Sequence, residues 1–560
     1  MAALNGSLIP ADYRPVVPLS TRKRFLSAAL TLAGVVLAPG RGLAARKRAV
    51  AVSAVSARNM GRRYAGDRAL LATVAPGVPG RETAAITLRL ERRATVTVEA
   101  VRTALRQTAS VWKSDLELGP GAHEVTWTPP PSTRVGSYVM RVTETTADGS
   151  RVLGGRRPFT LDRQKAAVVR VLGIEAAFGR ASYAPTQPMR LTISADVPEL
   201  RLQFLRCGHE TESTDRGDEL KGLPVGEPVR LDWSGKRSGP VTIDVQSGDW
   251  PTGVYAAKLE APDGRVGFAP FVLRPQTPGT ARQAIVMPTN TWQAYNFHDA
   301  DGDGWGDTWY AGGNSPMRLD RPYRDRGVPP RFRRYDLPFL KWLARTGHTP
   351  DVLADDDLEA TPSGDELRAR YDLVVFPRHS EYVTEHTYDV VERFRDLGGR
   401  LIFLSANNFF WKVEKDGVTM RRVKLWRELG RPEASLCGVQ YRANDDGSKQ
   451  GPFYVIAAEA APWLFDGTGL SNGSTFGEAV GGFGIEIDMT TPDSPPGTRV
   501  LALIPSLFGP GLHGEMGYYK TEAGARVFSA GVLDFGASVT FWPVRRMLEN
   551  LWRHMLEPAS

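Results

Sequence analysis

Hydrophobic and polar residues alternate along the first half of the chain, which predicts short β-strands. Between residues 83 and 145 the period of two recurs in TAAITLRL, ATVTVEAV, HEVTWTP and GSYVMRVTET, with Gly/Pro turns between them. A second series of such segments runs from MRLTIS to VGFAPFVLR, within residues 167–275. Short alternating strands at regular spacing are typical of a β-sandwich. The pattern predicts two Ig-like β-sandwich modules, at residues 58–165 and 166–278.

The period changes after residue 278. Near-continuous apolar runs, typical of buried parallel strands, are AIVMP (284–288), YDLVVFP (371–377) and GGRLIFLSAN (398–407). Between them, LPFLKWLARTGH (337–348) and residues 388–397 carry apolar side chains at helical spacing. Strands that alternate with helices predict a parallel sheet with crossover connections. Residues 279–560 are therefore predicted to form an α/β domain, with added β structure beyond residue 430 and a helix at 543–556.

The N-terminal 57 residues are predicted to be an export signal and a flexible segment. A basic stretch, Arg22-Lys23-Arg24, precedes an apolar run at residues 25–38 and then small residues. TRKRFLS is similar to a twin-arginine signal, with Lys23 where the second arginine would stand. We expect a secreted or cell-envelope protein. No apolar run reaches the roughly 18 residues of a spanning helix, so no transmembrane span is expected after signal removal.

Composition narrows the function further. Of 560 residues 42% are hydrophobic and 24% are charged, as in globular proteins, and the net charge is +8. This charge is diluted along the chain without a dense basic stripe among aromatics, so nucleic acid is not an expected partner. The two cysteines, Cys207 and Cys437, cannot build a disulfide framework or a thiolate zinc site, and both are predicted to be buried thiols.

Polar residues cluster where the predicted parallel strands end. Ligands of open α/β sheets bind beyond the carboxyl ends of the strands, and adjacent strands bring their ends together. The strand before residue 378 and the strand before residue 405 are followed by Arg378, His379, Glu381 and Tyr382, and by Ser405, Asn407, Asn408 and Trp411. A third polar segment, NTWQAYNFHDADGDGWGDTW, follows AIVMP. The three strand ends together predict an active site.

Two acidic runs offer carboxylates that could bind a metal ion. The loop with Asp299, Asp301, Asp303 and Asp307 places carboxylates at positions one, three, five and nine of a calcium loop, with Gly304 at position six. Position twelve is Tyr310 instead of glutamate, so a bound calcium ion and an empty acidic loop both remain open. Asp355-Asp356-Asp357 is predicted to be a solvated turn.

Several motifs follow in the order of one known family. These are TWQAYN (291–296), RPY (321–323), FLKWLARTGH (339–348), HSEY (379–382), GGRLIFLSANNFFW (398–411), and EMGYY with VFSAG (515–519, 527–531). The chain resembles the large subunit of N,N-dimethylformamidase over roughly residues 250–560. The resemblance implies an α/β domain of glutamine-amidotransferase-like type, preceded by β-rich domains.

The resemblance also implies a mononuclear iron site with two tyrosines and one glutamate. Carried over by motif, the ligands are Glu381 of HSEY, Tyr295 of WQAYN and Tyr323 of RPY, while Tyr310 and Tyr335 remain alternatives to Tyr323. Phenolate and carboxylate are hard oxygen donors that suit Fe(3+). Open coordination positions would admit water and a substrate carbonyl.

The implied reaction is hydrolysis of a C–N amide bond by metal-activated water. Glu515 of EMGYY would be the general base, with Glu522 as the alternative. His379 would transfer a proton or support a ligand, and Asn407 would orient the substrate.

Some features depart from the family enzyme. Val383 stands where the family usually has Trp, and that enzyme works with a small subunit that this chain does not contain. We therefore expect a small amide or saccharide-like substrate other than dimethylformamide, and an oligomer stays open. The alternative function is a non-catalytic secreted binding protein for carbohydrate or another surface polymer, in which the three metal ligands would not converge.

Overall fold

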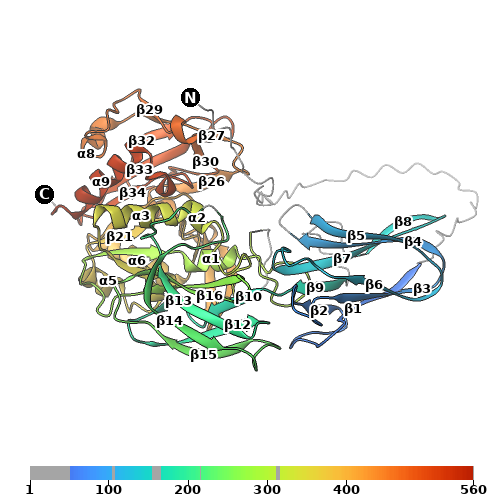
Figure 1. The fold of residues 1–560 in the computed structure, drawn as a ribbon. Coiled ribbons are helices and arrows are strands. Elements are labelled where there is room, and N and C mark those ends of the chain that lie inside the picture. Colours follow the sequence, from blue (N-terminus) through green and yellow to red (C-terminus); the bar gives the residue numbers. More distant parts are fainter. Residues whose placement is uncertain (1–50, 104–107, 154–165, 215, 311–315, 559–560) are drawn as a thin grey trace, which may run out of the picture.

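The computed structural model describes residues 51–103, 108–153, 166–214, 216–310 and 316–558 (Figure 1). Most of the predicted export signal lies outside these residues and stays a prediction. Strand β1 (Val52–Asn59) pairs with β3 (Ala84–Leu90), so the first β domain starts earlier than the predicted residue 58. Among the described residues, no helix is both long and apolar enough to cross a bilayer.

The first β domain consists of two sheets around one apolar core. Alternate strand residues face this core, as in β4, where Val96 and Val98 are buried between less buried neighbours. One sheet has the order β1-β3-β6, with β6 at Gly121–Trp127. The other has the order β2-β9-β7-β4-β5, with β8 on β7; its strands are β2 (Leu71–Val74), β9 (Ala167–Val171), β7 (Gly136–Thr146), β4 (Ala94–Thr103), β5 (Thr108–Leu118) and β8 (Gly149–Leu153). Because β9 belongs to this domain, its boundary lies after the predicted residue 165.

The second β domain also has two sheets. Its first sheet has the order β10-β12-β15, with β10 (Ile174–Phe178), β12 (Pro188–Ala195) and β15 (Val241–Gln246). The second has the order β11-β17-β16-β13-β14, with β11 (Ser182–Tyr183), β17 (Val266–Leu273), β16 (Gly253–Glu260), β13 (Glu199–Arg206) and β14 (Leu223–Asp232). Trp233 and Phe271 lie in the shared core. The predicted β-rich structure of the N-terminal half is thus confirmed, whereas its division into two Ig-like modules stays a prediction.

A nine-stranded sheet organises the third domain, in the order β20-β18-β21-β23-β34-β33-β32-β28-β29. The first five strands run parallel: β20 (Asp351–Ala354), β18 (Gln283–Met287), β21 (Leu373–Phe376), β23 (Arg400–Phe403) and β34 (Arg526–Ser529). The others are antiparallel: β33 (Gly514–Lys520), β32 (Arg499–Ile504), β28 (Phe453–Val455) and β29 (Thr475–Phe476).

Helices cover both faces of the parallel part of this sheet, which explains why parallel strands such as β21 are buried along their whole length. Ile285 and Ile402 share one core with α3 (Leu337–Thr346) and α9 (Trp542–Leu556), while Val286 and Phe403 share another with α5 (Gly364–Arg370) and α6 (Glu385–Asp396). The predicted strands, the helices near 337–348, 388–397 and 543–556, and the parallel sheet are confirmed. Likeness to glutamine amidotransferases stays a prediction.

Smaller elements surround the ends of the parallel strands. They are α1 (Thr289–Ala294), α2 (Phe332–Tyr335), α4 (Asp355–Glu359) and a four-stranded sheet of β19 (Met317–Arg318), β25 (Thr419–Leu425), β24 (Trp411–Asp416) and β22 (Tyr382–Val383). Strand β26 (Gln440–Asn444) pairs with β31 (Glu486–Met489), and β27 (Gln450–Gly451) pairs with β30 (Phe483–Gly484). The short helices α7 (Ala434–Cys437) and α8 (Pro462–Phe465) complete the α-helices of the described chain. Cys207 and Cys437 are buried free thiols, as predicted.

Candidate functional site

The segments that follow β18, β21 and β23 meet at one edge of the sheet. The backbone N–H of Glu381 donates to Thr291 Oγ1 at 3.2 Å, and Asn290 Nδ2 donates to the carbonyl of Tyr382 at 3.0 Å. The N–H of Ser380 donates to Asn408 Oδ1 at 3.0 Å. These bonds join α1 to the end of β21, and the end of β21 to the end of β23. The prediction that three strand ends come together is confirmed.

Tyr295 and Glu381 are in direct contact at this edge. The Tyr295 hydroxyl donates a hydrogen bond to the Glu381 carboxyl, and both side chains are buried. Burial, and then the charge of Glu381, raises the pKa of Tyr295 well above its usual value. Burial, and then the charge of Glu486, raises the pKa of Glu381 to about 8. A phenol oxygen and a carboxyl oxygen therefore converge away from water, as two of the predicted iron ligands should.

Tyr323 lies apart from this pair. It packs in the core that contains α3 and the Trp292 ring, and burial raises its pKa above the usual value. Among the described residues, no hydrogen bond joins Tyr323 to Tyr295 or Glu381. The ring of Tyr310, by contrast, lies 4.6 Å from that of Tyr295, edge to face. Tyr310 is the nearer of the two, and which of them would complete the ligand set stays a prediction.

His379 lies beside the same pair and faces a carboxyl that the sequence analysis did not single out. Its Nδ1 lies 3.5 Å from Glu486 Oε2, and its ring lies 5.6 Å from the ring of Tyr295. Both side chains are almost fully buried. Burial lowers the pKa of His379, so the neutral imidazole is favoured. Imidazole and carboxyl form a pair that can take up and return a proton.

Glu486 reaches His379 through long-range strand pairing. β31 pairs antiparallel with β26, and Ile487 bridges Val532, which follows β34. Ile485, directly before Glu486, has φ +66°, a left-handed conformation that is unusual for a β-branched residue. Such strain concentrates at functional sites. The local sequence GIEIDM carries no motif for this role, which is why sequence reasoning missed Glu486.

Asn407 has an unusual backbone conformation as well, with φ +60°. Its N–H donates to Asp488 Oδ1 at 3.0 Å, and burial raises the pKa of that carboxyl to about 8. The Asn407 side chain is buried, and its Oδ1 has no hydrogen-bond partner among the described residues. An unpaired buried amide oxygen costs free energy, so this atom is suited to receive a donor from a ligand.

Glu515 has different surroundings. It lies on β33, opposite Leu503, and its Oε2 accepts from the N–H and the hydroxyl of Thr490, each at 2.7 Å. No hydrogen bond or ion pair within the described part of the chain joins Glu515 to His379 or Glu381. Its predicted role as general base stays a prediction.

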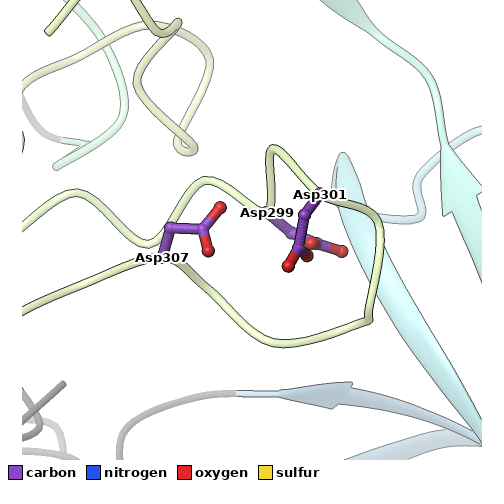
Figure 2. Close-up of side chains that lie close together, drawn as sticks. All are labelled: Asp299, Asp301 and Asp307. Atoms are coloured by element: carbon purple, nitrogen blue, oxygen red, sulfur yellow. The ribbon is translucent and has the colours of Figure 1, made fainter. Parts of the chain in front are cut away.

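The acidic loop brings three carboxyls together (Figure 2). One carboxyl oxygen each of Asp299, Asp301 and Asp307 lies within 4.8 Å of the others. Asp303 is outside this group, and its carboxyl accepts from the N–H of Trp305 at 2.8 Å. Burial raises the pKa of Asp299 to about 7, although the hydrogen bonds that its carboxyl accepts act to lower it. A calcium ion bound by Asp299, Asp301 and Asp307 stays a prediction.

The prediction of a solvated turn is wrong for Asp355. This carboxyl is buried at the start of α4 and accepts from the N–H of Asn290 at 2.7 Å and from the Thr289 hydroxyl at 3.2 Å. Burial raises its pKa to about 7. Asp355 therefore anchors the first turn of α1, the helix that leads to Tyr295. The sequence did not indicate this role, because three consecutive aspartates are typical of a solvated turn and only tertiary packing buries Asp355.

The family of this chain follows from comparison with known proteins. Residues 229–546 match the family described as N,N-dimethylformamidase beta subunit-like, C-terminal. The chain belongs to this family. The N,N-dimethylformamidase beta subunit of Paracoccus aminophilus is 24% identical over 285 residues, which cover 40% of this chain and 37% of that protein. That of an Alcaligenes species is 32% identical over 138 residues, covering 24% and 18%.

The matches thus span 37% and 18% of the two relatives' own lengths. Among solved structures, activated alpha-2-macroglobulin of Escherichia coli matches 40% of this chain and 20% of its own, at 12% identity and a TM-score of 0.17. The adhesin InvE of Yersinia pseudotuberculosis matches 36% and 56%, at 14% identity and a TM-score of 0.13. Scores this low say nothing about fold or function.

Proposed function

We propose that this dimethylformamidase-like protein is a metal-dependent amidohydrolase that cleaves a C–N amide bond with water. Family membership supports the proposal, together with relatives named as dimethylformamidase subunits. Because the match covers only part of those relatives, their activity is carried over here as part of the proposal. The expected substrate is a small amide. The word subunit in the relatives' names supports an oligomer, and the residues near the N-terminus support export.

The donor set at the site suits a hard metal ion. Tyr295 and Glu381 offer two buried oxygen donors in contact with each other, and the buried carboxyl of Glu486 raises the pKa of Glu381. Buried carboxyls of like charge are costly unless a cation or protons neutralise them. We propose Fe(3+) held by Tyr295, Glu381 and a second tyrosine, Tyr323 or Tyr310. Iron bound there would polarise a carbonyl and lower the pKa of water.

The chain's own residues supply proton transfer and orientation. His379, kept neutral by burial, accepts a proton at its imidazole and later returns it to the leaving amine. Glu486, 3.5 Å from Nδ1, stabilises the imidazolium that forms between these steps. Asn407 Oδ1 accepts an N–H of the substrate or of the leaving amine. The family resemblance implies Glu515 as the general base instead. Its carboxyl bonds to Thr490, so we favour His379, supported by Glu486, for this role.

One observation carries the proposal: the Tyr295 hydroxyl meets the Glu381 carboxyl beside the buried pair of His379 and Glu486. A structural core would pair such groups with fixed partners, but Nε2 of His379 lacks a hydrogen bond among the described residues. Buried polar atoms of this kind are satisfied by a bound molecule or water. Their convergence at the end of a parallel sheet is where substrates bind in α/β proteins.

The test is metal analysis of the full chain combined with an assay for amine release from simple amides. We expect iron, visible absorption from phenolate-to-iron charge transfer, and turnover. Tyr295→Phe and Glu381→Gln should lose metal, absorption and turnover, whereas Tyr518→Phe, a buried tyrosine that contacts His554, should retain all three. Protein without metal and without turnover on any amide would refute the proposal and favour a binding protein for carbohydrate or surface polymer.

A further inference from the structure

The first β domain contacts the acidic loop directly. Arg68 donates a hydrogen bond from its guanidinium to the carbonyl of Asp301. Thr103, the last residue of β4, donates from its hydroxyl to the carbonyl of Gly304 at 2.6 Å, in buried surroundings. Both bonds run from a side chain of the N-terminal domain to the backbone of the loop. The loop backbone is therefore held by a domain that precedes it by some 200 residues.

The loop also packs closely on this domain. Gly304 has φ +90°, and a Cβ added there would lie 2.5 Å from Val139 Cγ2 and 3.0 Å from Val168 Cγ2. A Cβ on Gly302, at φ +69°, would lie 2.5 Å from Leu71 Cδ2. Only glycine combines the left-handed backbone with this approach. The loop is fitted against β2, β7 and β9.

A series of charged side chains joins the first β domain, the second β domain and the segment just before the acidic loop. Arg170 of β9 pairs with Glu175 of β10, and His298 Nε2 lies 3.9 Å from the Glu175 carboxyl. Glu175 is buried, and Arg170 and His298 are partly buried. Arg170 and His298 outweigh the effect of burial and hold the pKa of Glu175 at about 2. His298, which directly precedes the acidic loop, thus contacts Glu175 of the second β domain, and through Glu175 it is linked to Arg170 of the first.

From Gly304 the loop leads straight to the candidate site. The N–H of Trp309 donates to the carbonyl of Ala294 at 2.8 Å, and the Thr308 hydroxyl donates to the same carbonyl at 3.0 Å. Ala294 is the last residue of α1 and Tyr295 follows it. The Tyr310 ring packs edge to face on the Tyr295 ring. A continuous series of contacts therefore runs from Thr103 to Tyr295.

We propose that the first β domain is a working part of the site, because the hydrogen bond from Thr103 to Gly304 fixes the loop that seats Tyr310 on Tyr295. Thr103 is then a positioning residue, although it lies in a different domain from the candidate site, some 200 residues before the loop. The effect on turnover rests on the proposed function, whereas the effect on the loop does not.

The experiment compares Thr103→Val, which keeps the shape and removes the hydroxyl, with Thr103→Ser, which retains the hydroxyl. Thr128→Val is the matched control, because its hydroxyl shares a 2.8 Å hydrogen bond with that of Thr83 on an exposed face of the same domain. Arg68→Gln is a second variant; it is exposed, so the fold is not at risk. Amide hydrogen exchange of residues 298–310 is measured on the full chain, together with kcat and KM for amide hydrolysis.

In Thr103→Val the Gly304 carbonyl remains buried without its donor, so exchange in residues 298–310 should rise by about tenfold. We expect kcat to fall by about tenfold with KM changed by less than about twofold, since the site is misaligned and not blocked. Thr103→Ser should restore both, and Thr128→Val should change neither.

The outcomes separate the two proposals. Unchanged exchange and unchanged kcat in both Thr103→Val and Arg68→Gln would overturn the positioning role. Faster exchange in a protein that hydrolyses no amide would keep the positioning role and overturn the proposed function. A loss of kcat in Thr103→Val that Thr103→Ser does not restore would also count against the hydroxyl.

Discussion

The phenol of Tyr295 donates a hydrogen bond to the carboxyl of Glu381, a residue 86 positions further along the chain. The contact requires α1 after β18 and the turn after β21 to lie side by side, which the parallel pairing of those strands provides. It is supported from behind by Asp355, which holds the start of α1. Two groups that are far apart in sequence thus form the centre of the candidate site.

The roles of Glu486 and Glu515 in proton transfer can be distinguished by replacing each of them with glutamine, which carries no charge. We expect Glu486→Gln to lower kcat by about 10²- to 10⁴-fold, the usual contribution of proton transfer, because it removes the charge 3.5 Å from His379. Glu515→Gln should lower kcat by less than about threefold, since Glu515 bonds to Thr490. Steady-state rates of both variants decide the matter. A large loss in Glu515→Gln with little in Glu486→Gln would restore the role that the resemblance implies.

Stability of the metal-free protein should depend on pH through Glu381. Its pKa is raised to about 8 in the folded protein, chiefly by burial, while an unfolded glutamate titrates near 4.3. The folded state binds this proton more tightly, so its contribution to stability is full at low pH and is lost as pH rises from about 4 to about 8.

Chelator-treated protein should therefore lose about 1 kcal/mol per pH unit more than Glu381→Gln between about pH 5 and pH 7. Urea unfolding at several pH values measures the two slopes. The exposed Glu522→Gln variant serves as the control and should keep the parent slope. Identical slopes for the parent and Glu381→Gln would mean that the carboxyl is already ionised in the folded protein.

Removal of the Asp355 carboxyl should destabilise the protein. Asp355→Ala leaves the Asn290 N–H and the Thr289 hydroxyl without their acceptor, which should cost about 1–3 kcal/mol of unfolding free energy. Asp355→Asn keeps an acceptor oxygen and should cost less. The neighbour Asp356 pairs with Lys415 at 2.6 Å and is more exposed, so Asp356→Ala should cost less than about 1 kcal/mol. Denaturant titration compares them, and equal costs at positions 355 and 356 would contradict the anchoring role.

Calcium should stabilise the acidic loop if the sequence prediction holds. A thermal melt in the presence of calcium should show a raised Tm, because binding to the folded state alone adds stability. Asp301→Asn changes one of the three clustered carboxyls and should reduce this shift. Asp320→Asn, whose carboxyl pairs with Arg318, is a control outside the cluster. A Tm that calcium leaves unchanged would indicate an acidic loop without an ion.

Much of the domain organisation was predictable because it rests on local periodicity. Alternation, as in TAAITLRL, predicts a strand with one buried face, and a continuous apolar run, as in YDLVVFP, predicts a strand buried on both faces. In the structure, exposed or half-buried residues alternate with buried ones in the second half of β3, and β21 is buried throughout. HSEY and WQAYN placed Glu381 and Tyr295 at strand ends, and parallel pairing brings those ends together. The predicted limits of the first domain, residues 58 and 165, do not match its strands, since β1 begins at Val52 and β9 ends at Val171. A strand boundary depends on its partner strand, which the local pattern does not show.

By itself, the sequence determined which segments are strands and helices, and that Glu381 and Tyr295 lie at neighbouring strand ends, since periodicity and sheet topology act over short stretches. Only the tertiary structure decided that Glu486 faces His379, that Asp355 is buried, and that Thr103 holds the loop beside Tyr295. Those contacts depend on long-range pairing and close packing between domains, where a few ångströms determine which polar groups meet, and no local pattern of residues encodes that distance.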